Sequence, residues 1–150
     1  MITAWRITRA MYADDAFSGA MRIAGRWHSA GTRIVYTADS VALATLEILV
    51  HMASPSIPAY VMIPCYFHEA LVEEVDVTRL PANWNAHVSP PELRQIGDRW
   101  ARERVSPVLR VPSAVIPIEF NYLLNPEHPD FGSVDVGEPR SFRLDPRLLT

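Results

Sequence analysis

The feature that most constrains this chain is a single carboxylate inside its most apolar stretch. Residues 40–53 (SVALATLEILVHMA) are long enough for a helix, Asp39 or Ser40 can cap its start, and the helix is expected to end before Pro55. Because the stretch is apolar almost all round, we expect this helix to be buried. Glu47 is its only formally charged residue. A buried carboxylate is costly unless it is paired or hydrogen-bonded, so the fold must supply a partner for Glu47.

Two interpretations of Glu47 remain open from the sequence. In the first, the carboxylate is structural and is tied to backbone donors or to an arginine, for which Arg6 is available in the strand-like run 2–8 (ITAWRIT). In the second, it is a catalytic or ribose-binding acid that faces a cleft, since carboxylates with shifted pKa values gather at active sites. His51 follows four residues later on the same helix face and could also hydrogen-bond to Glu47.

The rest of the chain predicts more strands than helices. Runs of β-branched and aromatic residues predict strands at residues 2–8, 33–38, 59–67, 71–77, 107–111, 114–120 and 141–144. Pro64 suggests that the third of these lies at a sheet edge or is broken. A second helix is expected over 90–104, where Ser89 and Glu92 have the spacing of a capping box. Strands and helices do not alternate strictly, so we expect a single compact α+β domain, residues 1–150, with a mixed, strand-rich core.

A glycine-bounded loop precedes the predicted strand at 33–38. Residues 25–31 (GRWHSAG) offer a guanidinium, an indole and small polar groups between two glycines. Glycine lets the backbone approach a ligand closely, and the planar fork of arginine matches phosphate oxygens, so a diphosphate-containing ligand would suit this loop. The alternative is structural, with Trp27 in the core and Arg26 solvated. Tyr36, in the strand that follows, can likewise face the core or a pocket.

Two more polar sites lie in sequences that favour turns. Ser113 follows Pro112, and a Pro-Ser pair between two apolar runs often does no more than form a turn. The GxSxG motif of a serine-hydrolase elbow is absent around it. Asn121 and Asn125, in the segment 121–126 (NYLLNP), are also expected to be turn formers.

Composition narrows the classes of function. A net charge of -3, from 14 basic and 17 acidic residues without a long basic run, disfavours direct nucleic-acid binding. Every basic residue is arginine, so no lysine is available for Schiff-base chemistry. The single cysteine, Cys65, and the scattered histidines lack the spacings of metal sites, so we expect no metal. The sequence has neither a signal-like leader nor an apolar run of membrane-spanning length, which favours a cytoplasmic protein with no membrane association.

Fragments spread over nearly the whole chain carry a resemblance to a known family. They are Trp5-Arg6-Ile7, Gly25-Arg26-Trp27 with Gly31, Val35-Tyr36, Ala44 to Glu47, Val111-Pro112-Ser113, residues 121–126, His128-Pro129, Phe142 and Asp145-Pro146-Arg147-Leu148. Their order and spacing, above all from Arg26 to Tyr36 to Glu47, resemble the RES domain, the toxin half of a bacterial toxin–antitoxin pair.

The resemblance implies a fold related to the ADP-ribosyltransferase toxins and an enzyme that consumes NAD as its substrate. The implied catalytic residues are Arg26, Tyr36 and Glu47. The residues implied to bind NAD are Arg6, Arg26, Tyr36, Ser113 and Asn121. The family also implies a cognate antitoxin with a helix-turn-helix domain of the Xre-like type that blocks the site, and an oligomer in complex with that antitoxin.

The reaction implied is cleavage of the nicotinamide–ribose bond by hydrolysis or phosphorolysis, which would deplete cellular NAD. One alternative uses the same site for mono-ADP-ribosylation of a protein. Another is a non-enzymatic interaction module in which these residues only hold the core together. The family pattern Gly-Gly-Arg-Trp-Asn is broken here by Ala24 and His28 at its first and last positions, and these departures bear on loop flexibility and on one polar contact.

Overall fold

One mixed sheet organises the chain in the computed structural model, which describes residues 1–19, 23–52 and 58–149. Its strands in this part of the chain are β1 (Ile2–Arg9), β2 (Val35–Ala38), β3 (Tyr60–Phe67), β4 (Val72–Glu74), β5 (Val108–Pro112), β6 (Phe120–Leu124), β7 (Asp135–Val136) and β8 (Arg140–Phe142). The spatial order is β4-β5-β6-β2-β1-β3-β7. β8 also pairs with β3, at residues 60–62, whereas β7 pairs with residues 65–66. The β4–β5 pair is parallel and the other pairs are antiparallel. The predicted α+β class with a strand-rich core is confirmed.

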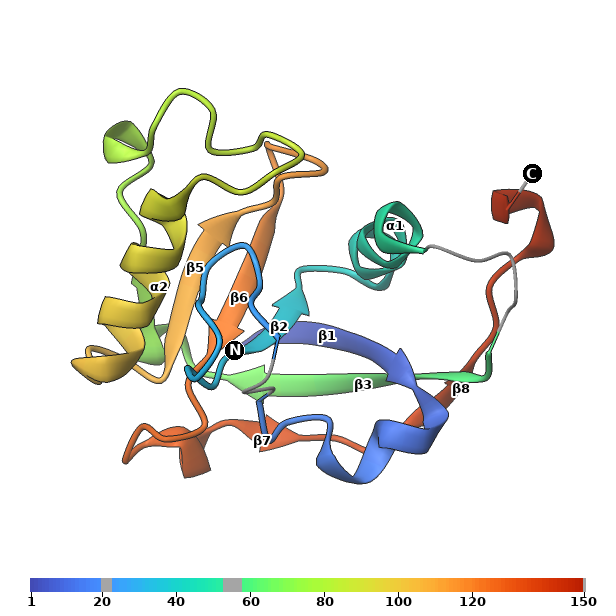
Figure 1. Cartoon of the computed structure of the whole chain (residues 1–150). Coiled ribbons are helices and arrows are strands. Elements are labelled where there is room, and N and C mark those ends of the chain that lie inside the picture. Colours follow the sequence, from blue (N-terminus) through green and yellow to red (C-terminus); the bar gives the residue numbers. More distant parts are fainter. Residues whose placement is uncertain (20–22, 53–57, 150) are drawn as a thin grey trace.

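The sheet is strongly curled, and β5 and β6 run steeply across the direction of β1 and β3 (Figure 1). β1 pairs with β3 along its whole length but meets β2 at a single register pair, Trp5 with Ala38. Few ladder hydrogen bonds therefore join the two halves of the sheet, and they diverge at the β1–β2 junction.

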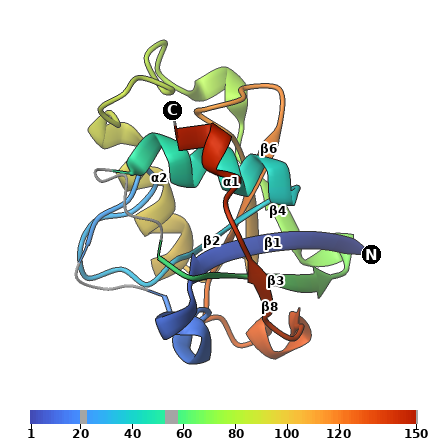
Figure 2. The ribbon, with the colours of Figure 1, turned by 90° about the vertical axis from the view of Figure 1, so that its right-hand side faces the viewer.

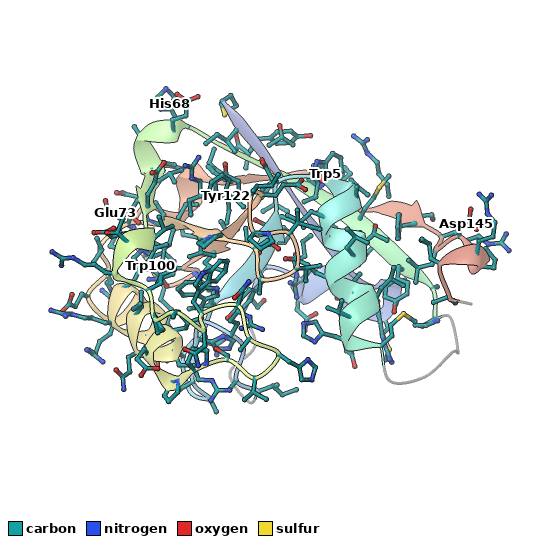
Figure 3. The ribbon with its side chains drawn as sticks, turned by 90° about the horizontal axis from the view of Figure 1, so that it is seen from above. Trp5, His68, Glu73, Trp100, Tyr122 and Asp145 are labelled. Atoms are coloured by element: carbon teal, nitrogen blue, oxygen red, sulfur yellow. The ribbon has the colours of Figure 1, made fainter. Side chains whose placement is uncertain are left out.

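Two α-helices accompany this sheet in the described residues, α1 (Val41–His51) and α2 (Pro91–Arg102). Short 3-10 helices cover Ala10–Asp15, Glu69–Leu71, Val77–Arg79, Phe131–Ser133 and Pro146–Leu149. α2 packs on the β5–β6 half through Leu93 and Trp100, which contact Leu109 and Leu123. α1 lies across the other half, above β1 (Figures 1 and 2). Seen from above, Trp100 lies on the α2 side and Trp5 beside α1 (Figure 3).

The prediction that the helix after Ser40 is buried is wrong. Ser40 caps it as expected, because its hydroxyl accepts the Leu43 N–H at 3.0 Å. Within the helix, however, only Leu43 and Ala44 are buried, whereas Leu46 and Val50 keep 38% and 55% of their surface exposed. The sheet covers one face of α1, and Ala42, Leu46 and Val50 on the other face are exposed. Ala53, the predicted helix end, lies outside the described residues.

The capping box predicted for the second helix is also wrong. Pro90 is the residue before α2, and no side chain caps this end. The Ser89 hydroxyl donates instead to the backbone carbonyl of Arg26 at 2.7 Å. The predicted apolar face of this helix is confirmed, since Leu93 and Trp100 are buried.

Residues 114–119 form a turn and not the strand predicted at 114–120. The Ser113 N–H donates to the Glu119 carbonyl at 2.9 Å, which closes a connection between β5 and β6. The strand falls on 120–124, so the interpretation of Asn121 as a turn former is wrong. Asn125 does form a turn, because its side-chain oxygen accepts the Glu127 N–H at 3.0 Å.

The remaining strands are present with shifted ends. The strand predicted at 71–77 shrinks to β4, because 3-10 turns flank it and Asp76 caps the second of them. β3 is neither an edge strand nor broken at Pro64, since it runs from Tyr60 to Phe67 with neighbours on both sides. Pro64 falls between the register of β7 and that of β8, where its carbonyl accepts the Gly137 N–H at 2.8 Å. A proline is tolerated there because no partner strand needs its missing N–H.

Candidate active site

A cleft of about 1200 Å³ opens beside the β1–β2 junction. Its walls come from β1, β2, α1, the loop before β2 and the loop before α2. Among the predicted site residues, it is lined by Arg6, Arg26, Tyr36, Glu47 and Asn121. Ser113 is fully buried and lies behind Glu47, outside the lining. The structure therefore brings together side chains that are up to 115 positions apart (Arg6 to Asn121).

Glu47 is held by two neutral donors. The Asn121 side-chain N–H donates to its Oε1 at 2.8 Å, and the Ser113 hydroxyl donates to its Oε2 at 3.1 Å. Burial raises the pKa of Glu47 above its ordinary value, while the bonds from Asn121 and Ser113 oppose that rise. Neither an arginine nor His51 partners this carboxylate in the described residues. The charge of Glu47 is therefore not cancelled by an ion pair, and it faces the cleft.

The two donors are positioned by the β5–β6 hairpin. Ser113 directly follows β5, and its oxygen accepts the N–H groups of Val115 and Ile116, each at 3.2 Å, so that its own proton points to Glu47. The Asn121 amide on β6 also donates to the Thr37 carbonyl at 3.1 Å. Both side chains thus have fixed orientations, which is what a preorganised carboxylate needs.

Arg6 projects from β1 across the junction with β2. Its Nη1 donates to the Tyr36 backbone carbonyl at 3.1 Å, and its buried Nε has no hydrogen-bond partner in the described residues. Burial lowers the pKa of Arg6, an effect that the charge of Asp15 opposes. Arg6 also lines the cleft, where a guanidinium can bind an anion.

Arg26 lies on the loop before β2, and its backbone is held from two sides. Ser89 donates to the Arg26 carbonyl, and Arg94 Nε donates to the Gly25 carbonyl at 3.2 Å. The guanidinium itself donates to the Trp84 carbonyl at 3.1 Å, and burial lowers its pKa. Trp27 is 2% exposed, in the core beneath α2. The structural interpretation thus holds for Trp27 but not for Arg26, which is half-buried and lines the cleft.

Tyr36 and His28 form a bonded pair at the base of this loop. The His28 Nδ1 lies 2.7 Å from the Tyr36 hydroxyl, which also accepts the Trp27 N–H at 3.1 Å. Burial raises the pKa of Tyr36 well above its usual range, so the phenol stays protonated. A Cβ on Gly25 would lie 2.6 Å from that hydroxyl and 2.8 Å from the His28 ring. Gly25 is therefore required for the close approach of the loop to Tyr36.

Sequence reasoning missed several residues that hold the loop. Ser89 and Arg94 bond to backbone carbonyls more than 60 positions away, and Asp98 accepts the Ser29 N–H at 2.9 Å. No local pattern marks such long-range bonds. His28 did carry a signal, because it stands where the resembled pattern has asparagine.

Within the described ranges, no group of three or more His, Cys, Asp or Glu side chains could hold a metal ion. Neither α1 nor α2 has the length and apolarity to cross a bilayer, and the same is true of every helix in the described chain.

Comparison with known proteins identifies the family. A model of the RES domain matches residues 3–145. The Toxin Res of Photorhabdus laumondii is 36% identical over 149 residues, which span 97% of this chain and 96% of that protein. The Prs ADP-ribosylating toxin of Sphingobium sp. (strain YBL2) is 34% identical over 153 residues, 97% of this chain and 95% of its own length.

A solved structure shares the fold. The crystal structure of the M. tuberculosis MbcT–MbcA toxin–antitoxin complex contains a chain that superposes with a TM-score of 0.67 over 99% of this chain and 86% of its own length, at 16% identity. The curled sheet with its few helices is thus the fold of that toxin. With a family model that matches nearly from end to end and relatives of equal length, the chain belongs to the RES domain family, the family of the Res toxins.

Proposed function

We propose that this chain is the toxin of a toxin–antitoxin pair and that it cleaves NAD at the nicotinamide–ribose bond. The observation that carries the proposal is the electrostatic layout of the cleft. Glu47, Arg6 and Arg26 all line it, and none of the three forms an ion pair within the described chain. NAD offers the complementary charges, namely a diphosphate and a ribose that becomes cationic as nicotinamide leaves.

The carboxylate is suited to the bond-breaking step. When the bond between C1′ and the nicotinamide nitrogen breaks, both electrons go to nicotinamide, which departs neutral, and positive charge spreads over C1′ and the ring oxygen. Glu47, oriented by Ser113 and Asn121, stabilises this cation directly or through the ribose hydroxyls. Because its partners are neutral donors, its full charge acts on the sugar.

Both arginines bind the diphosphate of NAD. Arg26 supplies a guanidinium from a loop whose backbone is held by Ser89 and Arg94, and Arg6 adds a second guanidinium from β1. The hydroxyl of Tyr36 is already engaged, so Tyr36 contributes its ring, which orients the nicotinamide ribose by stacking.

In the proposed cleavage of NAD, the acceptor of ADP-ribose is water or phosphate. In each case its oxygen bonds to C1′ and it gives up a proton, so the reaction balances without a metal or a redox partner. A second candidate acceptor is a protein side chain, and the name of the Sphingobium relative, an ADP-ribosylating toxin, favours it. The charged groups of the cleft serve both reactions.

An activity that consumes NAD must be restrained in the cell that makes it. We therefore propose a cognate antitoxin of the helix-turn-helix, Xre-like type that covers the cleft, with an oligomer in the complex. The toxin–antitoxin complex of the structural neighbour supports an antitoxin partner of some type.

The test is incubation of the purified chain with NAD, followed by chromatography of the products. Free nicotinamide with ADP-ribose indicates hydrolysis, and phosphorylated ADP-ribose that requires added phosphate indicates phosphorolysis. A second incubation with cell lysate and labelled NAD detects transfer to protein as a labelled band.

A matched pair of variants assigns the activity to the cleft. Glu47→Gln should abolish nicotinamide release, whereas Glu73→Gln, on the exposed edge strand β4 far from α1 (Figure 3), should not change it. No release of nicotinamide under any of these conditions would refute the proposed function. Equal release by the parent protein and Glu47→Gln would refute the role of Glu47.

A further inference from the structure

His28 occupies an unusual position for a titratable side chain. It is 4% exposed, and both of its ring nitrogens are hydrogen-bonded. Nε2 lies 3.0 Å from the Ile23 carbonyl, on the loop that carries Arg26, and Nδ1 lies 2.7 Å from the Tyr36 hydroxyl on β2. The ring therefore connects the Arg26 loop to the sheet.

These partners determine where the ring proton resides. A backbone carbonyl can only accept, so Nε2 carries the hydrogen and donates to Ile23. In the neutral ring Nδ1 is then an acceptor, and it takes the proton of the Tyr36 hydroxyl. The phenol oxygen in turn accepts the Trp27 N–H. The result is a directed chain from Trp27 through Tyr36 and His28 to Ile23.

We infer that His28 is a positioning residue of the NAD site, which as a neutral Nε2–H ring holds the Tyr36 hydroxyl and so fixes the backbone that presents Arg26. The effect of His28 on NAD cleavage rests on the proposed function, whereas its hydrogen bonds come from the structure alone. Gly25 N also donates to the His28 carbonyl at 3.0 Å, so the residue closes the loop on itself around Arg26. The ring of Tyr36 lies 5.4 Å from that of His28 between centroids, in contact with the same cleft.

Protonation would reverse this arrangement. A charged His28 has donors on both nitrogens, so the Tyr36 oxygen would face two donors, His28 and Trp27, and its own proton would lose its partner. Burial lowers the pKa of His28, the Ile23 carbonyl and the Asp98 charge oppose this, and Arg94 lowers it further. The positioned loop is therefore present above the ordinary histidine pKa of about 6.5 and is lost as the pH falls below it toward the lowered pKa.

Two amide variants separate the two bonds of the ring. In His28→Asn the side-chain oxygen can take the place of Nδ1 and accept from Tyr36, without a titrating group. In His28→Gln the amide reaches the place of Nε2 and keeps the Ile23 bond, but the acceptor for Tyr36 is lost. The two side chains are chemically alike, so a difference between them reports the Tyr36 bond and not burial in general.

The experiment measures kcat/KM for NAD cleavage between about pH 5 and pH 8 for the parent protein and both variants. At pH 8 we expect His28→Asn to match the parent protein and His28→Gln to lose roughly tenfold, the effect of one well-made hydrogen bond. On acidification the ratio of parent activity to His28→Asn activity should fall, because only the parent protein titrates at this position. Glu47 titrates alike in both, so it cancels in the ratio. Equal activity of His28→Asn and His28→Gln at pH 8 would overturn the inference.

A second measurement keeps the inference testable without NAD cleavage. Ring nitrogen shifts in an NMR spectrum, assigned with the variants, report the tautomer of His28, and hydrogen exchange reports the Trp27 amide. We expect the Nε2–H tautomer, and slow Trp27 exchange in the parent protein and His28→Asn but faster exchange in His28→Gln. An Nδ1–H tautomer, or unchanged exchange in His28→Gln, would overturn the inference even if the NAD proposal stands. If no NAD is cleaved but these signals are as expected, only the proposed function fails.

Discussion

The two sides of the cleft hold their charged groups in opposite ways. On the α1 side, both oxygens of the Glu47 carboxylate are hydrogen-bonded to the side chains of Ser113 and Asn121. On the loop side, the Arg26 guanidinium donates to a backbone carbonyl, and Ser89 and Arg94 hold the backbone of the loop. The first arrangement orients a charge directly, whereas the second positions the chain that carries a charge.

This difference predicts that changes on the α1 side affect the reaction, whereas changes beneath the loop affect the structure. A neutral replacement of Glu47 removes a charge that the fold keeps at a desolvation cost, so activity should fall without a loss of stability. A change beneath the loop should instead disturb the packing of Trp27 and, through it, the placement of Arg26. The following experiments test the contrast, in order of decreasing effect.

The largest effect is expected for Glu47→Gln. Turnover of NAD should fall by on the order of 10²–10³, the usual consequence of removing one preorganised electrostatic group. Because burial raises the pKa of Glu47, its ionised form destabilises the folded state once the pH exceeds its unfolded pKa, and fully above the raised value. The variant should thus unfold at the same denaturant concentration as the parent protein, or a higher one, at pH 7. A clear loss of stability would make Glu47 a structural residue.

Gly97→Ala tests the close contact between α2 and the loop that carries Trp27. A Cβ at this α2 position would lie 1.6 Å from the Trp27 carbonyl oxygen. Alanine favours a helix by about 1 kcal/mol, yet overpacking of this kind should lower the free energy of unfolding by about 1–3 kcal/mol. Gly132→Ala is the control, because its Cβ would meet nothing within 4 Å. Equal stability of the two variants in a denaturant titration would show that the loop is not seated on α2 in this way.

Arg26→Ala and Arg6→Ala should differ in a measurable way. In a Glu47→Gln background, calorimetry should show the dissociation constant for NAD rising roughly 10- to 100-fold for Arg26→Ala, with little change in stability. Arg6→Ala should weaken NAD binding and also lower the free energy of unfolding, because its Nη1 bonds to Tyr36 across the β1–β2 junction. Arg99→Ala, exposed on α2, is the control. An unchanged dissociation constant for Arg26→Ala would move the diphosphate elsewhere.

The smallest effect is expected for Ser113→Ala, seen in the pH profile. Since the pKa of Glu47 is raised, kcat/KM should fall on acidification at a higher pH than an ordinary glutamate would cause. The Ser113 hydroxyl bonds to the ionised form and opposes that rise, so its removal should shift the acid limb to still higher pH. An acid limb that stays in place would mean that Asn121 alone controls the carboxylate.

Much of the secondary structure could be predicted because it depends on local patterns. The strands at 2–8 and 59–67 and the cap at Ser40 follow from residue type and spacing. The errors arise where tertiary contacts override such patterns. The turn-like Asn121 lies in a strand because the neighbouring strands and Glu47 supply its partners, and Ser89 bonds to Arg26 rather than to α2.

By itself the sequence determined the kinds of chemistry available: one carboxylate in an apolar helix, arginine as the only basic residue type, and a glycine loop beside a strand. Family-like spacing also marked Arg26, Tyr36 and Glu47 together. Only the tertiary structure decided that Glu47 pairs with neutral donors and not with Arg6, and that His28 engages the Tyr36 hydroxyl. The physical reason is that hydrogen bonds and desolvation depend on neighbours in space, which the curled sheet assembles from residues far apart in the chain.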